Sequence, residues 1–307
     1  MVSLLPSATE IVCALGLGDD LVGVTHECDW PPEVAGKTVV TRATRVRQGA
    51  RSREIHRRVR DALHGGSSLY ALDAEVLRDL RPDLILTQEL CRVCAVAYEQ
   101  VDEVCRAIDT DIRVVSLEPT TLEGVLNTIA TVGAMTESEN AALDLVRRLR
   151  SRLGRIERAV QRRREDGFRA PRVVALEWLD PPFTVGHWVP EQIQRAGGWD
   201  LLGEPGEPAH ETSWRAIRDV DPEMLLLMPC GFHLQDGVET WRTARRPPYW
   251  NRLEAVRRGQ VFALDGSAYF SRPGPRVIAG IELLAEIFDP DTFIETSPPG
   301  SWTPLFE

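Results

Sequence analysis

The chain has 307 residues, of which 43% are hydrophobic and 27% are charged, and this is the composition of an ordinary globular protein. Its length allows two domains of roughly 100–150 residues each, so a single small core is not expected. A net charge of −10, from 36 lysines and arginines against 46 acidic residues, argues against a partner made of nucleic acid.

The first third of the sequence predicts alternating strands and helices. A short apolar strand at Val2 to Leu5 comes before a helix in which Ser7 is the N-cap and Glu10 completes a capping box. Such alternation is typical of a mostly parallel sheet. The further strands are expected at Leu21 to Val24, Val39 to Val40, Asp83 to Leu86 and Ile112 to Val115, and the further helices at Arg53 to Leu63, Asp73 to Leu80 and Ala95 to Ile108.

After a helix at about Leu122 to Ala134, a long helix is predicted from about Glu137 to Arg164. Apolar residues recur along it at spacings of three and four, which places them in one stripe. About 28 residues at a rise of 1.5 Å make a rod of roughly 42 Å, far longer than a crossover on one sheet requires. We therefore expect this helix to join two separate bodies.

The alternation restarts after Gly167. We predict an α/β fold with two Rossmann-like lobes, mostly parallel sheets, one long connecting α-helix and a ligand cleft between the lobes. The expected divisions are an N-terminal lobe at 1–118, connecting helices at 119–168, a C-terminal lobe at 169–288 and an irregular tail at 289–307. The C-terminal strands are expected at Val173 to Leu176, Met224 to Met228 and Val261 to Leu264, and the helices at Pro190 to Ala196, Trp214 to Val220 and Pro275 to Ile287.

The location was predicted from the first residues, Met1 to Ser7, which lack the basic and apolar regions of a signal peptide. We expect a cytoplasmic monomer, with an exported or lipid-anchored protein as the alternative if the natural chain starts further upstream. The sequence has no run of 18 or more apolar residues, so no membrane-spanning helix is expected.

Candidate binding residues follow the predicted strands, because ligands of parallel α/β sheets gather at the carboxyl ends of strands. Tryptophan together with histidine and carboxylates suits a large, partly apolar ligand with polar edges. The alternatives are that Trp188 only packs inside its lobe and that His26 and His187 are hydrogen-bonded loop residues. The candidates are His26, Asp29, Trp30, Gln88, Glu89, Leu90, Cys91, Trp178, Gly186, His187, Trp188, Phe232, Tyr269 and Arg272.

Cys91 and Cys94 form a Cys-x-x-Cys spacing at a predicted strand-to-helix junction, where a helix N-terminus lowers a thiol pKa. This spacing leaves open a thiol-redox centre, or a zinc site completed by His26 and Cys28 or by Cys230. A structural zinc site usually has a second matched pair of ligands, and the sequence has none. The remaining alternative is that the two cysteines line a pocket or pack.

Motifs for nucleotide binding and hydrolysis are missing: the sequence has no Gly-x-x-x-x-Gly-Lys, Gly-x-Gly-x-x-Gly, Gly-x-Ser-x-Gly or His-Glu-x-x-His. Glu177 and Asp180 could form an acid/base pair, but nothing in the sequence sets their separation. We therefore expect a protein that is not an enzyme and requires no cofactor.

Three segments near the N-terminus, Val2 to Glu10 (VSLLPSATE), Leu15 to Gly18 (LGLG) and Leu21 to Thr25 (LVGVT), strongly resemble the opening of the vitamin B12 and ferric-siderophore binding proteins of ABC importers. Leu80 to Leu86 (LRPDLIL) and its echo Val220 to Leu226 (VDPEMLL) are similar to the strand starts of that family's two lobes. The resemblance covers residues 1 to 288. It implies a class III, helix-hinged fold with a ligand in the interlobe cleft and little closure on binding.

His26 to Asp29 (HECD) and Cys91-x-x-Cys94-Ala95-Val96 are similar to the branch labelled cobalamin-binding, so the ligand implied is cobalamin or another corrinoid, and next a ferric siderophore. A siderophore would favour the cations Arg272 and Arg92. The resemblance implies that His26 or His187 approaches cobalt. It further implies that Trp30, Trp178, Trp188, Phe232 and Tyr269 face the corrin ring and that Ser7, Gln88 and Glu89 bond its amide fringe.

In this family an acidic residue on each lobe docks on the membrane permease. Glu75 matches the first of these residues. Arg215 stands where the second is commonly glutamate, which argues against docking on an ABC permease. Glu211 is the nearby acidic alternative.

Overall fold

The computed structural model describes residues 1–43, 53–54, 56–57, 70–88, 101, 104–105 and 112–305. These residues form two compact units. Unit 1 holds the described residues up to Pro119 except Arg53, together with Gly124–Val146, and unit 2 holds Arg53, Thr120–Glu123 and the residues from Arg147 on. The cleft expected between two lobes stays a prediction.

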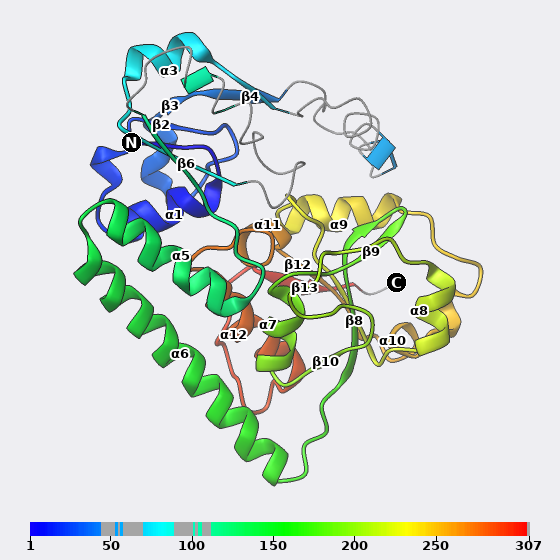
Figure 1. The fold of residues 1–307 in the computed structure, drawn as a ribbon. Coiled ribbons are helices and arrows are strands. Elements are labelled where there is room, and N and C mark those ends of the chain that lie inside the picture. The colour runs from blue at the N-terminus through cyan, green and yellow to red at the C-terminus, as the bar shows by residue number, and fades with distance from the viewer. Residues whose placement is uncertain are drawn as a thin grey trace. The chain divides into compact units, whose positions relative to one another are not determined.

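Unit 1 is built on a parallel sheet. Among its described residues, five strands lie in the order β3-β2-β1-β6-β7, and every neighbouring pair is parallel (Figure 1). The core on this sheet includes Val2, Ile85 and Leu77, which are fully buried. The strands are β1 (Val2–Ser3), β2 (Gly23–Val24), β3 (Thr38–Val39), β6 (Leu84–Thr87) and β7 (Arg113–Ser116), and β4 (Thr41–Ala43) pairs with β5 (Tyr70–Leu72).

Helix α1 (Pro6–Ala14) begins at Pro6, which suits the first turn because proline has no N–H to leave unpaired and its φ is already helical. Its N-cap residue is Leu5, and no side chain caps it. The prediction of Ser7 as N-cap with Glu10 in a capping box is therefore wrong. Ser7 instead lies inside the first turn and is buried.

One helix–strand segment in each unit has the same local construction. Helix α3 (Ala74–Leu80) is capped by Asp73, whose Oδ1 accepts from the N–H of Val76 at 3.2 Å, and it is followed by β6. Helix α8 (Trp214–Val220) is capped by Ser213, whose Oγ accepts from the N–H of Ala216 at 3.1 Å, and it is followed by β11 (Met224–Leu227). Both helices end in a left-handed residue just before a proline.

Unit 2 has a mixed sheet with helices on both faces (Figure 1). Four of its strands, β10-β8-β11-β12, are parallel, and β9 and β13 pair antiparallel with β8 and β12. Helices α8, α9 and α10 pack on one face and α7 and α12 lie on the other. The bounds are β8 (Arg172–Leu179), β9 (Pro182–Thr184), β10 (Trp199–Asp200), β12 (Val261–Leu264), β13 (Trp302–Pro304), α7 (Val189–Arg195), α9 (Leu234–Thr243), α10 (Glu254–Arg257) and α12 (Val277–Phe288).

The long helix is confirmed as α6 (Glu139–Glu165), and it follows α5 (Leu122–Met135). Its predicted apolar stripe is buried throughout, from Ala142 to Val160. The division between the two units falls inside it, after Val146. The helix therefore contributes buried residues to both units.

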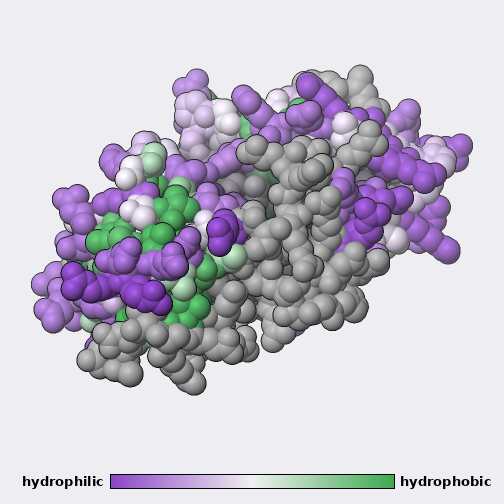
Figure 2. Space-filling model, turned by 90° about the horizontal axis from the view of Figure 1, so that it is seen from above, coloured by the Kyte–Doolittle hydropathy of each residue, from purple (hydrophilic) through white to green (hydrophobic). Residues whose placement is uncertain are grey.

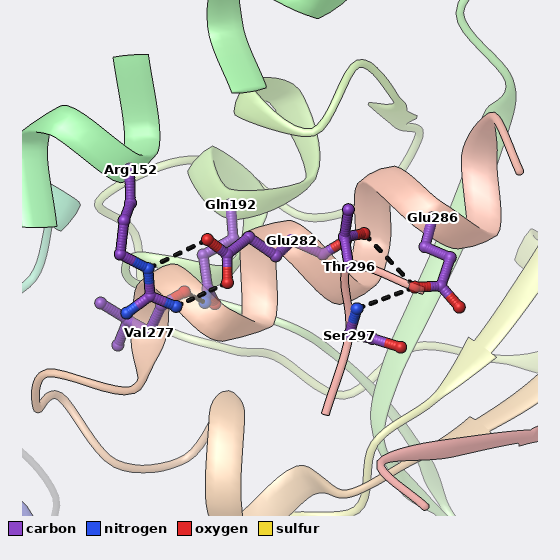
Figure 3. Close-up of polar contacts among 7 residues, drawn as sticks. All are labelled: Arg152, Gln192, Val277, Glu282, Glu286, Thr296 and Ser297. Carbon is purple, nitrogen blue, oxygen red and sulfur yellow. Dashed lines mark hydrogen bonds and ion pairs between the residues drawn. The ribbon is translucent and has the colours of Figure 1, made fainter. Parts of the chain in front are cut away.

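Helix α12 is tied to three other parts of unit 2 (Figure 3). From α6, the Nε of Arg152 donates to Glu282 at 3.0 Å, and from α7 the amide of Gln192 donates to the carbonyl of Val277 at 2.8 Å. From the C-terminal segment, the N–H of Ser297 donates to Glu286 at 2.8 Å. These bonds give α12 a fixed position against the sheet.

The C-terminal tail, predicted to be irregular, contains the strand β13. The ring of Trp302 meets the ring of Phe262 edge-on with centroids 5.6 Å apart, and the N–H of Leu305 donates to the carbonyl of Val261 at 2.8 Å. A run of three residues carries no periodicity, so only this packing reveals the strand.

Within the described residues, every helix is too short or too polar to cross a bilayer. The face shown in Figure 2 carries mainly hydrophilic residues among its coloured atoms, with hydrophobic residues gathered in one area at the left.

Candidate ligand-binding site

The loops at the carboxyl ends of β8, β11 and β12 are bonded to one another in unit 2. The N–H of Cys230, after β11, donates to the carbonyl of Glu177 at 2.9 Å, and the N–H of Ser267 donates to the carbonyl of Phe232 at 2.9 Å. Ser267 belongs to the short helix α11 (Gly266–Tyr269), which follows β12. A Cβ at Gly266 would lie 2.3 Å from the carbonyl oxygen of Pro229, so the close approach requires glycine.

Trp178 and Phe232 meet at this edge. Their ring centroids are 5.7 Å apart, and the ring planes are inclined by 49°. The indole nitrogen Nε1 of Trp178 is buried and has no hydrogen-bond partner among the described residues. A buried tryptophan usually finds a partner for this N–H, so the unpaired donor makes the pair a candidate contact for a ligand.

His187 lies in a tight loop just before α7. Its φ of 53° is left-handed, its N–H donates to the carbonyl of Glu207 at 2.6 Å, and its carbonyl accepts from the N–H of Gly206 at 2.8 Å. A Cβ at the preceding Gly186 would lie 2.2 Å from the backbone nitrogen of Ala209. Burial lowers the pKa of the His187 imidazole, because the apolar surroundings disfavour its charged form.

Trp188 is buried, and its Nε1 donates to the carbonyl of Phe270 at 3.0 Å. This contact agrees with the alternative in which Trp188 packs inside its own lobe. The amide of Gln192, also on α7, donates to the carbonyl of Tyr269 at 3.2 Å. Trp188 and Gln192 thereby hold the start of α7 against the end of α11 and position Tyr269, which is only partly buried.

The four residues Trp178, His187, Phe232 and Tyr269 are called here the aromatic edge. Two cations lie near it along the chain. Arg272 is 7% exposed, and the guanidinium of Arg276 lies 5.9 Å from the ring centroid of Tyr269. Asp265 caps α11 through the N–H of Ala268 at 2.8 Å and lies 3.0 Å from Nδ1 of His233.

Asp200 is a buried acid beside the His187 loop. Nothing in the sequence indicated it as part of the site. A Cβ at Gly203 would lie 2.5 Å from Oδ2 of Asp200 and 2.9 Å from the carbonyl of Val185, so these groups are packed together. Burial raises the pKa of Asp200 to about 7, while backbone N–H groups, including that of Leu202, act in the opposite direction. Gln192 was also missed, since a single polar residue on an apolar helix gives no pattern.

The carboxyl edge of the unit 1 sheet carries a chain of hydroxyl, thiol and imidazole groups. Thr9 Oγ1 donates to Ser3 Oγ at 2.9 Å and lies 3.0 Å from Cys28 Sγ. Thr41 Oγ1 lies 2.8 Å from Thr25 Oγ1 and also 2.8 Å from Nδ1 of His26. These contacts agree with the alternative of His26 as a hydrogen-bonded loop residue.

The remaining candidates in unit 1 differ in how far they are exposed to solvent. Ser7 and Gln88 are buried, whereas Asp29 is exposed and the side chain of Trp30 is 44% exposed. Five further candidates lie outside the described residues: Glu89, Leu90, Cys91, Arg92 and Cys94. The structure therefore does not test the zinc or thiol alternative. Where the chain is described, no group of three or more histidine, cysteine or acidic side chains is placed to hold a metal.

The two predicted docking positions are equivalent in the fold. Glu75 and Arg215 are each the second residue of their helix, α3 and α8, and both are exposed. Arg215 Nε lies 3.7 Å from Asp219 Oδ2 one turn further on. The two units thus present opposite charges at matching places.

Comparison with known proteins places this fold. The sequence profile of the family described as "Periplasmic binding protein" matches residues 1–268. The chain belongs to the periplasmic binding protein family. This membership confirms the resemblance found in the sequence and the two-lobed α/β class, and it supports the expectation of a binding protein over an enzyme.

Three known proteins are similar to the chain over most of their length. An ABC transporter substrate-binding lipoprotein of Bacillus subtilis is 28% identical over 96% of this chain and 81% of its own. The crystal structure of a periplasmic vitamin B12 binding protein of Vibrio cholerae has a TM-score of 0.66, with 20% identity over 94% of this chain and 95% of that one. A periplasmic heme binding protein of Pseudomonas aeruginosa has a TM-score of 0.70, with 21% identity over 95% and 92%.

The expectation of a cytoplasmic location is wrong. The family is that of periplasmic binding proteins, and the Bacillus subtilis relative is a lipoprotein. The first seven residues lack signal-peptide features, but the match to this family begins at residue 1, so these residues do not decide the location.

Proposed function

We propose that the chain is the substrate-binding protein of an ABC importer and that it captures a corrinoid of the vitamin B12 type. The observation that carries the proposal is the Trp178–Phe232 pair at the carboxyl edge of the unit 2 sheet, with its unpaired indole N–H. Relatives named vitamin B12-binding proteins match over nearly the whole chain, including one of Vibrio cholerae at 22% identity over 92% of it.

A corrin ring is wide and flat, with apolar faces and a fringe of amides. Aromatic rings pack well on such faces, and fixed N–H groups bond the amide carbonyls. The aromatic edge offers both kinds of group, because Trp178, Phe232 and Tyr269 supply rings, and Trp178 supplies an indole N–H that has no partner among the described residues. Gly186 supports the site by admitting the close approach of the neighbouring loop.

Unit 1 supplies polar contacts in the same proposal. Gln88 follows β6 and is 8% exposed, Ser7 lies buried in the first turn of α1, and the ring of Trp30 is exposed. We assign Gln88, Ser7 and Glu89 to the amide fringe and Trp30 to the ring face. Asp29, His26, Leu90 and Cys91 complete the set proposed for unit 1.

The permease partner is proposed to contact Glu75, which stands exposed near the start of α3. The matching residue of unit 2, Arg215, reverses the charge. The permease would therefore present a basic group to unit 1, and the unit 2 contact would need a different chemistry from the acidic one common in the family.

The test is a titration of the purified chain with cyanocobalamin, heme and a ferric siderophore, followed by calorimetry and visible absorbance. We expect one cyanocobalamin per chain with a Kd in the micromolar range or tighter, which corresponds to about −8 kcal/mol or better. Tighter binding of heme or of the siderophore would move the assignment to that chelate. A cyanocobalamin Kd weaker than millimolar would end the proposal.

A further inference from the structure

His187 is held in a backbone conformation that a side chain with a Cβ disfavours. Its φ of 53° is left-handed, and both of its backbone polar groups are bonded to the facing loop at Gly206 and Glu207. The preceding Gly186 has no room for a Cβ. Strained residues cluster at binding and active sites, so this conformation makes His187 a candidate for such a site.

The ring of His187 is also fixed in direction. It lies nearly parallel to the ring of Trp188, with an interplanar angle of 24° and centroids 5.9 Å apart. Trp188 is anchored in turn, because its Nε1 donates to the carbonyl of Phe270 at 3.0 Å. The imidazole therefore lies against a ring that is anchored by its own hydrogen bond.

The two ring nitrogens of His187 are in different surroundings. Nδ1 is buried and has no hydrogen-bond partner in the described part of the chain, whereas Nε2 is not among the buried nitrogens that lack a partner, in a side chain that is only partly buried. A neutral imidazole carries one proton, and an N–H buried without an acceptor is rarer in proteins than an acceptor without a donor. The favoured tautomer thus leaves Nδ1 as an unused acceptor and places the proton on Nε2.

We propose that His187 is a specificity residue of the aromatic edge, whose Nε2–H donates a hydrogen bond to a carbonyl or carboxylate oxygen on the rim of the bound chelate. It does not coordinate the metal, because the lone pair of the accessible nitrogen is then taken up by its proton. The inference rests on the proposed binding function and deepens it. It selects chelates that have an acceptor at one place on their rim.

The test compares three variants for binding of cyanocobalamin. His187→Gly removes the ring and relieves the left-handed backbone, so we expect it to fold, and thermal unfolding checks that it does. We expect it to bind about tenfold more weakly, the usual loss for one hydrogen bond in a desolvated site. His187→Ala should show the same loss, and His187→Gln, which keeps an amide N–H near the position of Nε2, should recover most of the affinity.

A second probe distinguishes a His187 that donates a hydrogen bond from a His187 that coordinates the metal. In aquocobalamin the axial water exchanges for an imidazole, and the visible bands shift when it does. We expect the native chain to bind aquocobalamin and cyanocobalamin alike, with no shift of these bands that depends on His187. A shift seen with the native chain and lost in His187→Gly would overturn the inference, as would equal affinities of that variant and the native chain. Failure of the native chain to bind any of cobalamin, heme or a ferric siderophore would overturn the proposed function with it.

Discussion

The carboxyl edges of the two sheets differ in what their polar atoms do. In unit 1 the hydroxyls of Thr9 and Thr41 are bonded to neighbouring side chains of the same edge. In unit 2 the edge is aromatic, and the indole N–H of Trp178 is buried without a partner among the described residues. An edge with its bonds already made is preorganised, whereas an edge with unmade bonds gains most from a ligand. We therefore expect unit 2 to supply the larger share of the binding energy for the proposed ligand.

The same contrast appears on the outside of the two units. Helices α3 and α8 have the same length, the same kind of cap and the same left-handed end, yet the exposed second residue is Glu75 in one and Arg215 in the other. The fold is repeated and the surface chemistry is not. Each of the following predictions tests one side of these contrasts.

The largest effect is expected at Asp200, the buried acid beside the His187 loop. Folding raises its pKa from 3.8 to about 7, so the protonated form is favoured in the folded state. The stability gained from protonated Asp200 is fully present below about pH 4 and is lost as the pH rises through about 7. The rise in its pKa corresponds to about 4 kcal/mol in the free energy of unfolding. Urea unfolding at pH 4 and pH 8 measures this fall. Between the two pH values the free energy of unfolding should fall by about 4 kcal/mol less in Asp200→Asn than in the native chain.

The matched control for Asp200 is Asp236→Asn, because Asp236 is exposed on α9. It should follow the native pH dependence. If the free energies of unfolding of the native chain and Asp200→Asn change with pH in the same way, ionisation of Asp200 does not destabilise unit 2.

Gly186→Ala should destabilise unit 2 and weaken ligand binding together. Its Cβ would lie 2.2 Å from a backbone nitrogen, and overpacking of this kind costs about 1–3 kcal/mol or more. Gly36→Ala is the control in unit 1, since a Cβ there meets nothing within 4 Å. Thermal unfolding checks both variants. A Gly186→Ala chain as stable as Gly36→Ala would mean that the His187 loop is loosely held.

The caps of α3 and α8 test whether the two segments are equivalent in energy as well as in geometry. Asp73→Ala and Ser213→Ala each remove one bond to a helix N–H, and each should cost about 1 kcal/mol. Denaturant unfolding of the two variants gives the comparison. A cost at one cap with none at the other would contradict the equivalence.

The smallest effect on stability is expected for Arg215→Glu. It replaces an exposed ion pair with Asp219 by a repulsion worth a few tenths of a kcal/mol. Its value lies in docking, because it gives both helices a glutamate at the same position. The measurement is binding to the importer in membrane vesicles, and Arg242→Glu on α9 is the control, whose binding should equal that of the native chain. Stronger binding of Arg215→Glu alone would identify Arg215 as the group that sets the unit 2 contact. An unchanged affinity would exclude it.

Much of the fold could be predicted because its signals are local. The apolar stripe of α6 and the alternation of strands and helices identify the two α/β halves before any contact is known. Strands of two or three residues such as β9 and β10 have no measurable period and were missed. Helix α9 was missed although Leu234, Val238 and Trp241 have helical spacing, because Gly237 in its middle is a poor helix former.

The candidate site was predicted in part for a similar reason. The rule that ligands gather at strand ends pointed to Trp178, Phe232 and Tyr269, which the structure brings to one edge. Burial and partners are set by tertiary packing, so the sequence could not distinguish the anchored ring of Trp188 from a ligand-facing one. It could not indicate that Asp200 is buried either.

The most direct test of the central claim is the affinity for cyanocobalamin of Trp178→Ala beside Trp199→Ala. Trp199 is 58% exposed on β10 and pairs with Arg172 at the amino end of β8, while Trp178 stands at the carboxyl end of the same strand. If the aromatic edge binds the ligand, Trp178→Ala should lose about 30-fold or more, as expected for an aromatic anchor worth about 2 kcal/mol, and Trp199→Ala should bind like the native chain. Equal affinities for the two variants would contradict the account.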